Sequence, residues 1–185
     1  MNRHSISLLW AICFIFLSGC LVTMNQDAQE GPCIIDTLLI SDSLLPSDRF
    51  YETGSRSSYD PPAKIGIEKI GTAFSSENAG GIVHNVYRFN TEKEAQDEIE
   101  QIIKFEFVNT IDSEWFSAPI TPNIHADNAK LACTALSQNG VRCRFVAQYR
   151  VYVSDLFVDL ITLNYEDLRL IIEQLNKNMV TCFAS

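Results

Sequence analysis

The sequence predicts an α+β fold in which an antiparallel sheet carries two helices. Extended apolar runs precede each of two amphipathic segments, first within residues 65–89 and again within residues 130–163. Strands that follow one another directly, and are then followed by a helix, are typical of antiparallel sheets with helices packed on them. The Ile-Glu-Gln triplets in the two amphipathic segments are compatible with a strand-strand-helix unit that occurs twice.

In the first half, strands are predicted at residues 65–74 and 82–89, and a helix follows them. Thr91 and Glu94 have the spacing of a capping box, which marks the beginning of this helix. Its inward stripe consists of Ala95, Ile99, Ile102, Ile103 and Phe107.

The second half repeats the pattern, with a strand at about residues 130–136, a turn, and an extended run over residues 141–163. This run exceeds the usual strand length, so we expect a bend or bulge near Ser154 and Asp155. A final helix is predicted at about residues 165–179 with Asn164 as its cap. Its inward stripe consists of Leu168, Ile171, Ile172, Leu175 and Met179.

Two segments before the first strands are less regular. Residues 34–45 are apolar with interspersed aspartates, a pattern that fits either a strand or a short helix. Residues 53–64 are rich in Gly, Ser, Asp and Pro, which predicts a surface loop.

The N-terminus has the order of a secretory signal. Arg3 and His4 precede an apolar stretch that ends at Leu17-Ser18-Gly19-Cys20. The stretch of about 12 residues covers roughly 18 Å, too short for a hydrocarbon core of about 30 Å. Leu17-Ser18-Gly19-Cys20 resembles the lipobox of bacterial lipoproteins. The resemblance implies cleavage before Cys20, acylation of its thiol and anchoring in the cell membrane or outer membrane by more than one acyl chain. The alternative is an ordinary signal peptide.

These features divide the chain into a signal peptide at residues 1–19, a lipidated tether at residues 20–31 and one α+β domain at residues 32–185. The net charge of −9 opposes binding to nucleic acid and to anionic lipid headgroups. Contact with the membrane is therefore expected through the lipid anchor.

Four cysteines remain after Cys13 leaves with the signal and Cys20 takes the lipid. Their even number favours two disulfides outside the cytoplasm, and three connectivities are possible in principle. We expect Cys133 with Cys143, because they flank a turn, and therefore Cys33 with Cys182, which would tie the ends of the domain together.

The Cys133–Cys143 pair also predicts its turn. A loop centred on Gln138, with Gly140 in a bulge, places the two cysteines opposite each other. A four-cysteine zinc site is the alternative, but the sequence lacks a C-x2-C pair. The segment LACTALSQNGVRCRFVAQYRVYVSDL is also similar to parts of bacterial lipoproteins whose families imply no known activity, and this similarity supports the hairpin disulfide.

No catalytic, metal or nucleotide motif stands out, and no cofactor is expected. Asp155 and Asp159 would lie about 13 Å apart on one strand face, beyond the separation that glycosidase carboxylates need. We expect them either to mark an exposed stretch of the strand or to accept hydrogen bonds from Arg or Tyr. His84 and His125 lack the spacing of a metal site. Gly66, Gly71, Gly80 and Gly81 do not form a phosphate-binding loop.

The best candidates for ligand contact are Trp115 and Phe116, which precede a proline-rich loop, and Arg150 and Tyr152, on a polar, aromatic sheet face. The alternatives are core packing for the aromatic residues and snorkelling over the sheet for the polar ones.

The sequence therefore favours a lipid-anchored, extracytoplasmic binding or interaction module at the cell envelope, whose ligand is an envelope protein or a small molecule. The alternatives are an enzyme assembled from dispersed residues, such as His84 or His125 with a carboxylate, and a structural assembly lipoprotein.

Overall fold

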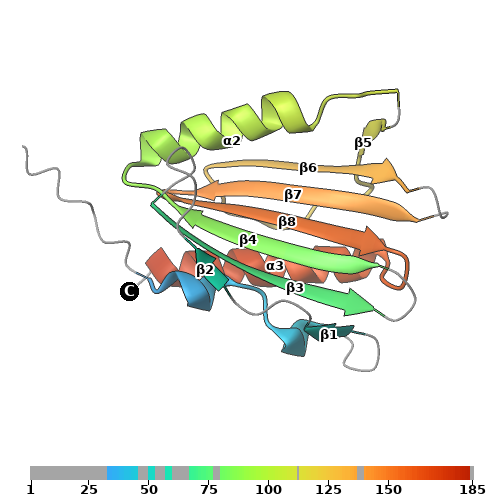
Figure 1. The fold of residues 1–185 in the computed structure, drawn as a ribbon, viewed down its shortest axis with the longest axis horizontal. Coiled ribbons are helices and arrows are strands. Elements are labelled where there is room, and N and C mark those ends of the chain that lie inside the picture. The colour runs from blue at the N-terminus through green and yellow to red at the C-terminus, as the bar shows by residue number, and fades with distance from the viewer. Residues whose placement is uncertain are drawn as a thin grey trace, which may run out of the picture.

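In a computed structural model the chain forms an antiparallel sheet with one long helix on each face (Figure 1). The structure describes residues 33–45, 50–52, 57–59, 67–76, 80–111, 113–136 and 140–183. The signal peptide, Cys20 and the tether lie outside these ranges. The predicted α+β class is confirmed.

The elements follow one another from the N-terminus as two short 3-10 helices, strands, a helix, more strands and a final helix. Their bounds are η1 Ile35–Leu38, η2 Asp42–Leu44, β1 Phe50–Glu52, β2 Ser57–Tyr59, β3 Glu68–Ser76, β4 Gly81–Arg88, α2 Glu92–Glu106, β5 Trp115–Ser117, β6 Asn128–Ala135, β7 Val141–Tyr149, β8 Tyr152–Leu160 and α3 Tyr165–Phe183. The strand order across the sheet is β1-β3-β4-β8-β7-β6-β5, and β2 also pairs with β3.

A strand-strand-helix unit occurs in both halves. The hairpin β3–β4 directly precedes α2, and the hairpin β7–β8 directly precedes α3. Further strands come before each hairpin, β1 and β2 in the first half and β5 and β6 in the second.

The long run over residues 141–163 is a hairpin, and the predicted bend near Ser154 and Asp155 is wrong. Both residues lie within the regular pairing of β8. The chain reverses at Arg150 and Val151, so that Tyr149 pairs with Tyr152. Neither turn residue is a glycine or an asparagine, the residues that usually indicate a hairpin turn in a sequence. A tertiary contact stabilises this turn instead, because Asp127 accepts a hydrogen bond from the Arg150 N–H at 2.7 Å.

The β6–β7 hairpin has the predicted register. Cys133 lies opposite Cys143, which centres the connection on residue 138. The Leu136 N–H donates to the Gly140 carbonyl in the same register, and Gly140 has no positive φ, while residues 137–139 of the predicted bulged turn lie outside the described residues. A Cβ at Gly140 would lie 2.8 Å from Ile161 Cγ1, so this glycine permits close packing.

Both helices begin at the predicted caps. The Thr91 side chain accepts a hydrogen bond from the Glu94 N–H, and the Asn164 side chain accepts from the N–H groups of Glu166 and Asp167. Helix α3 continues beyond the predicted residue 179 to Phe183. This extension places Cys182 in its last turn, where it is bonded to Cys33.

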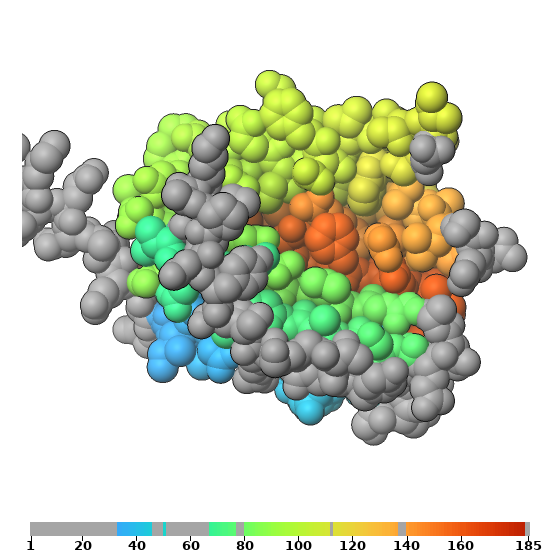
Figure 2. All heavy atoms as spheres, in the orientation of Figure 1, coloured from blue at the N-terminus to red at the C-terminus, as the bar shows by residue number. Residues whose placement is uncertain are grey.

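Alternation along the strands divides the apolar side chains between two faces of the sheet. Phe145 and Ala147 of β7 belong to the larger core with α3 and η1, and Val146 packs with Ala95 and Ile99 of α2. All five predicted inward residues of α3 are buried. Figure 2 views the α2 face, where side chains of β8 and β4 remain in view below α2.

Two less regular segments before β3 contain short elements of secondary structure. The apolar segment at residues 34–45 contains η1 and η2, which decides between the strand and the short helix. Within the predicted loop at residues 53–64, residues 57–59 form β2, which pairs with β3 at the sheet edge. The rest of that loop lies outside the described residues.

Candidate functional site

The four residues predicted to contact a ligand lie at opposite ends of the sheet. Trp115 begins β5 and pairs with Thr134 of β6, which in turn pairs with Arg142 near the start of β7. Trp115 and Arg142 therefore lie at the same level of the sheet. Arg150 follows the end of β7. Eight residues of strand separate these levels, or roughly 26 Å. The structure therefore does not bring the two pairs of residues together.

We name the two ends of the sheet after residues that lie there. The Cys33 end contains Cys33, Arg150 and the first turn of α2: the Tyr152 hydroxyl donates to the Cys33 carbonyl, and the Gln148 side chain donates to the carbonyls of Arg150 and Glu92. The Trp115 end contains Trp115, Arg142 and the end of α2.

Tyr152 belongs to the core. Its side chain is fully buried, and its ring lies 5.9 Å from that of Phe183. Arg150 is exposed, and its guanidinium carbon lies 5.2 Å from the centroid of the same Phe183 ring. Of these two residues, only Arg150 is available to a ligand, and its backbone borders the polar pocket described below.

The two histidines of the domain are occupied in different ways. His84 is fully buried. Its Nδ1 accepts a hydrogen bond from the Ile40 N–H at 3.1 Å, and its Nε2 lies 2.9 Å from Ser154 Oγ. Burial lowers the pKa of His84 to about 3. His125 is exposed on the α3 side, where its N–H donates to Asn176. Neither histidine lines any of the three pockets described below.

The two aspartates of β8 form ion pairs with arginines of β7. Arg144 donates to both carboxylate oxygens of Asp155 at 2.9 Å, and Arg142 contacts both oxygens of Asp159. Burial disfavours the charged form of Arg144, but hydrogen bonds and charge from Asp155 raise its pKa overall. The predicted role of these aspartates as hydrogen-bond acceptors agrees with these contacts.

An aromatic pocket of about 410 Å³ lies at the Trp115 end, between the end of α2, β5 and β6. Its lining residues are Phe107, Val108, Asn109, Trp115, Phe116, Ser117, Lys130 and Ala132. The rings of Phe107 and Trp115 lie 4.9 Å apart between centroids. The Asn109 side chain accepts a hydrogen bond from the backbone N–H of Trp115 at 2.8 Å, which joins the segment after α2 to β5.

The buried Arg144–Asp155 ion pair contacts Phe107, one of the residues that line the aromatic pocket. The Arg144 guanidinium lies 5.5 Å from the Phe107 ring and 4.5 Å from the Phe157 ring. Arg144 also contacts Glu106 at the end of α2. Because Arg144 is itself fixed by Asp155, these contacts hold Phe107 in place before any ligand arrives.

Exposed apolar side chains occur in the lining of the aromatic pocket, at Val108 and Phe116, and close to it in the chain, at Phe105 and Ile111. Phe105, Val108 and Phe116 are 61%, 50% and 41% exposed, and Ile111 is fully exposed. We call these four residues the apolar rim. Lys130, which lines the pocket, makes no ion pair with any residue in the described ranges.

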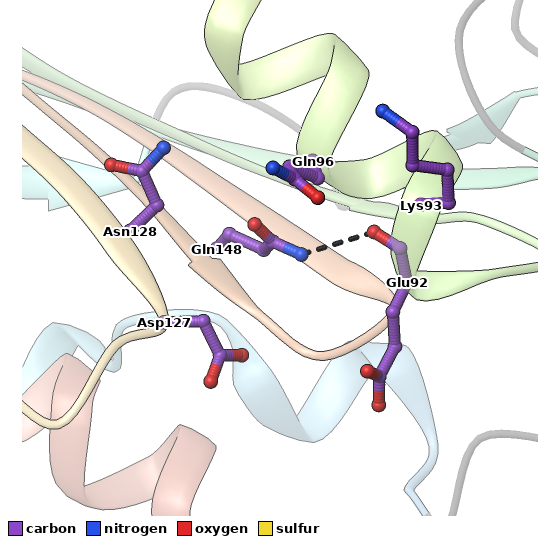
Figure 3. A pocket seen from close by; sticks show the side chains of 6 residues that line it. All are labelled: Glu92, Lys93, Gln96, Asp127, Asn128 and Gln148. Carbon is purple, nitrogen blue, oxygen red and sulfur yellow. Dashed lines mark hydrogen bonds between the residues drawn. The ribbon is translucent and has the colours of Figure 1, made fainter.

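A polar pocket of about 600 Å³ lies toward the Cys33 end, between the first turns of α2 and the start of β6 (Figure 3). Its lining residues are Glu92, Lys93, Gln96, Asp127, Asn128 and Gln148. The sequence analysis did not single out any of them. The available signal was a glutamine within the apolar run of β7, which suggests a buried amide with partners.

A third pocket, of about 500 Å³, adjoins the Cys33–Cys182 disulfide. It is lined by residues of η1 and the last turns of α3, including Leu38, Lys177 and Thr181. No group of three or more His, Cys, Asp or Glu side chains within the described ranges could hold a metal ion. In the same ranges, no helix has the length and apolar character needed to cross a bilayer.

Comparisons with known proteins identify a similar fold. No family model and no curated protein sequence matches the chain. Among solved structures, the extracellular domain of PknH from Mycobacterium tuberculosis is similar to it, with a TM-score of 0.52 at 10% sequence identity. The similarity covers 78% of this chain and 94% of that domain. The chain therefore shares the fold of an extracellular domain.

Proposed function

We propose that this chain is a lipid-anchored, extracytoplasmic module that binds a partner protein at the cell envelope through the aromatic pocket and its apolar rim. The observation that carries the proposal is that Val108 and Phe116 are exposed in the lining of the aromatic pocket, while Phe105 and Ile111, close by in the chain, are exposed as well. Exposed apolar patches of this kind mark interaction sites, and aromatic side chains dominate binding energy at protein interfaces.

The extracytoplasmic location is supported by the two disulfides, because such bonds persist in oxidising compartments. Lipid anchoring is supported by the lipobox-like sequence ending at Cys20. In an anchored chain the tether joins the domain at Cys33, so the Cys33 end would face the membrane. The Trp115 end would then point away from it, toward proteins of the envelope.

The chemistry of the surface defines the partner. Apolar side chains of the partner would cover Phe116 and Ile111, while an acidic group would pair with Lys130, which has no ion pair among the described residues. The Phe107 and Trp115 rings would provide a rigid contact area, because Arg144 contacts the Phe107 ring and the Trp115 ring packs against it.

The partner-binding surface can be tested by photocrosslinking in cells. A photoreactive phenylalanine analogue at Phe116 should crosslink to one envelope protein, whereas the same analogue at Leu170 should not. Leu170 is a matched control because it is an exposed apolar residue on α3, on the other face of the sheet. The captured protein, once purified, should bind the unmodified chain and bind Phe116→Ser at least about tenfold more weakly. Equal crosslinking from both positions would argue against this surface.

Lipid anchoring is tested separately by intact-mass analysis of the native protein. The expected mass corresponds to a chain that begins at Cys20, carries acyl chains and has lost four thiol hydrogens. Cys20→Ser should remove the acyl chains and release the protein from the membrane fraction. A Cys20→Ser product that stays equally firmly in that fraction, cleaved at the same bond, would contradict the anchor.

A further inference from the structure

We propose that the polar pocket is a second binding site, which takes a primary ammonium group. The proposal depends neither on the aromatic pocket nor on the identity of a protein partner. It rests on Gln148, whose two amide N–H groups are both bonded, and on Gln96, whose amide nitrogen donates to Glu100, so that the carbonyl oxygens of both side chains are left to accept.

Gln148 is the central residue of the pocket. It is only 5% exposed, and its Nε2 donates to the carbonyls of Glu92 and Arg150, both at 3.1 Å. The reverse amide orientation would place Oε1 against two carbonyl oxygens, so the observed one is fixed. Figure 3 shows the Gln148 oxygen turned away from Glu92 and toward the Gln96 side chain. No described residue donates a hydrogen bond to this oxygen.

The side chain of Gln96 is also oriented by a hydrogen bond from its amide nitrogen. Its Nε2 donates to Glu100 Oε1 at 2.9 Å, one turn further along α2. Its oxygen is therefore directed to the other side, and Figure 3 shows it on the side of Gln148. Two carboxamide oxygens with fixed orientation thus border the same pocket and lack donors among the described residues. A ligand that donates hydrogen bonds would satisfy both.

The charge of the pocket favours a cationic donor. Glu92 and Asp127 are two acidic residues of the lining, with carboxylates at its lower edge in Figure 3, while the ammonium of Lys93 is paired with Asp97. The N-terminus of α2 opposes a cation with an equivalent charge of only about +0.5. The carboxylates therefore outweigh the helix dipole. The side chain of Asn128, which has no hydrogen-bond partner among the described residues, adds a further carboxamide group at the start of β6.

The acceptor-rich lining distinguishes an ammonium group from a hydroxyl ligand. Each hydroxyl group of a sugar both donates and accepts, so it needs donors from the protein as well. In this pocket both amide N–H groups of Gln148, and one of the two of Gln96, are already bonded to protein oxygens. A primary ammonium group has three N–H donors and no acceptor, which matches the groups that remain.

A primary ammonium group reaches the pocket either from a soluble amine or from an ethanolamine lipid headgroup. The pocket lies toward the Cys33 end, where the tether joins the domain. In a chain anchored through Cys20 this end would face the bilayer, so both sources are chemically available. The test therefore has one arm for each source.

The first arm uses the full chain in detergent and methylammonium chloride, with tetramethylammonium chloride at the same ionic strength as the control. Side-chain amide NMR signals of Gln148 and Gln96 should shift on titration with methylammonium. Tetramethylammonium carries the same charge but has no N–H, so it should produce no saturable shift. Equal responses to the two cations, or no response to either, would overturn the proposal.

Variants locate the site. Gln96→Met should weaken methylammonium binding by roughly tenfold, because it removes one acceptor of a charge-assisted hydrogen bond. Gln101→Met is the matched control, since Gln101 is also an exposed glutamine on α2 but does not line the pocket. Gln101→Met should leave the affinity unchanged, and an equal loss in both variants would overturn the assignment.

The second arm places the full chain in nanodiscs of phosphatidylcholine, with or without phosphatidylethanolamine. Shifts of the same two amides only in discs that contain phosphatidylethanolamine would support the ammonium site and identify the headgroup as its source. Shifts with methylammonium but not in these discs would support the site with a soluble amine as its ligand. The readout is independent of any protein partner, so failure here leaves the aromatic pocket untouched.

Discussion

The carboxylate of Asp127 accepts a hydrogen bond from the backbone N–H of Arg150 at 2.7 Å, and Arg150 is the one non-glycine residue of the described chain with a positive φ, 53°. The left-handed conformation at this residue costs about 1 to 2 kcal/mol. A side chain that comes from the beginning of β6 thus stabilises the turn between β7 and β8.

We predict that Asp127→Ala lowers the free energy of unfolding by about 1 kcal/mol, because the Arg150 N–H loses its acceptor. Asp127→Asn should be milder, since the amide oxygen can still accept. Urea denaturation of the purified chain measures both changes. The hydrogen bond would be irrelevant to stability if the two variants had equal effects or none.

His84 makes stability depend on pH. Its pKa is about 3 in the folded protein, against an ordinary value of about 6.5 in the unfolded chain, so the unfolded chain binds the extra proton first as pH falls. The contribution is complete above pH about 6.5 and is lost progressively toward pH about 3. Between pH 7 and pH 5 the loss from this group is about 2 kcal/mol.

The measurement is the free energy of unfolding by urea at several pH values for the unmodified chain and His84→Gln. The variant should show a smaller decrease between pH 7 and pH 5, whatever its stability at pH 7. The same pH slope in both proteins would contradict this account. As a second readout, the His84 ring signals should not titrate in NMR spectra above pH about 4.5.

The two disulfides should differ in their contribution to stability. Cys33–Cys182 links residues 149 positions apart, and Cys133–Cys143 links residues 10 positions apart. The loop-closure model gives about 5 kcal/mol for the longer loop and about 3 kcal/mol for the shorter one. Replacing each pair by alanines and comparing urea midpoints tests this order. A larger loss from the Cys133 and Cys143 pair would show that local packing, not chain entropy, dominates.

The buried Arg144–Asp155 pair should be sensitive to the loss of one partner. Asp155→Ala leaves a buried guanidinium with only the exposed Glu106 nearby, which should cost about 3 kcal/mol or more. Arg142→Ala removes a pair whose arginine is 46% exposed and should cost about 1 kcal/mol or less. Thermal unfolding of the two variants measures the difference. In the double variant Arg144→Met with Asp155→Leu, much of the stability should return.

The same variants report on the aromatic pocket. Arg144 lies against Phe107, so the double variant should loosen the Phe107–Trp115 contact even if stability returns. Tryptophan fluorescence reports this change directly, because Trp115 is the one tryptophan after residue 10 in the sequence. An unchanged emission spectrum would show that Phe107 is held by other contacts.

Local sequence patterns were sufficient for several elements of this fold. The caps at Thr91 and Asn164, the inward stripe of α3 and the register of the Cys133–Cys143 hairpin all depend on spacings within about 20 residues. Such spacings reflect helix and strand periodicity directly. The aromatic character of Trp115 and Phe116 also made them visible as candidates before their neighbours were known.

The turn at Arg150, the burial of Tyr152 and the polar pocket were decided by tertiary structure. Arg150 adopts its conformation because Asp127, 23 residues earlier, meets its N–H, and Tyr152 faces the core because β8 pairs with Tyr149 in a particular register. The orientation of Gln148 depends on a carbonyl of Glu92, 56 residues away. Periodicity specifies which side chains share a face, but only the packed chain determines which distant polar groups meet there, since each buried donor must find its acceptor across elements.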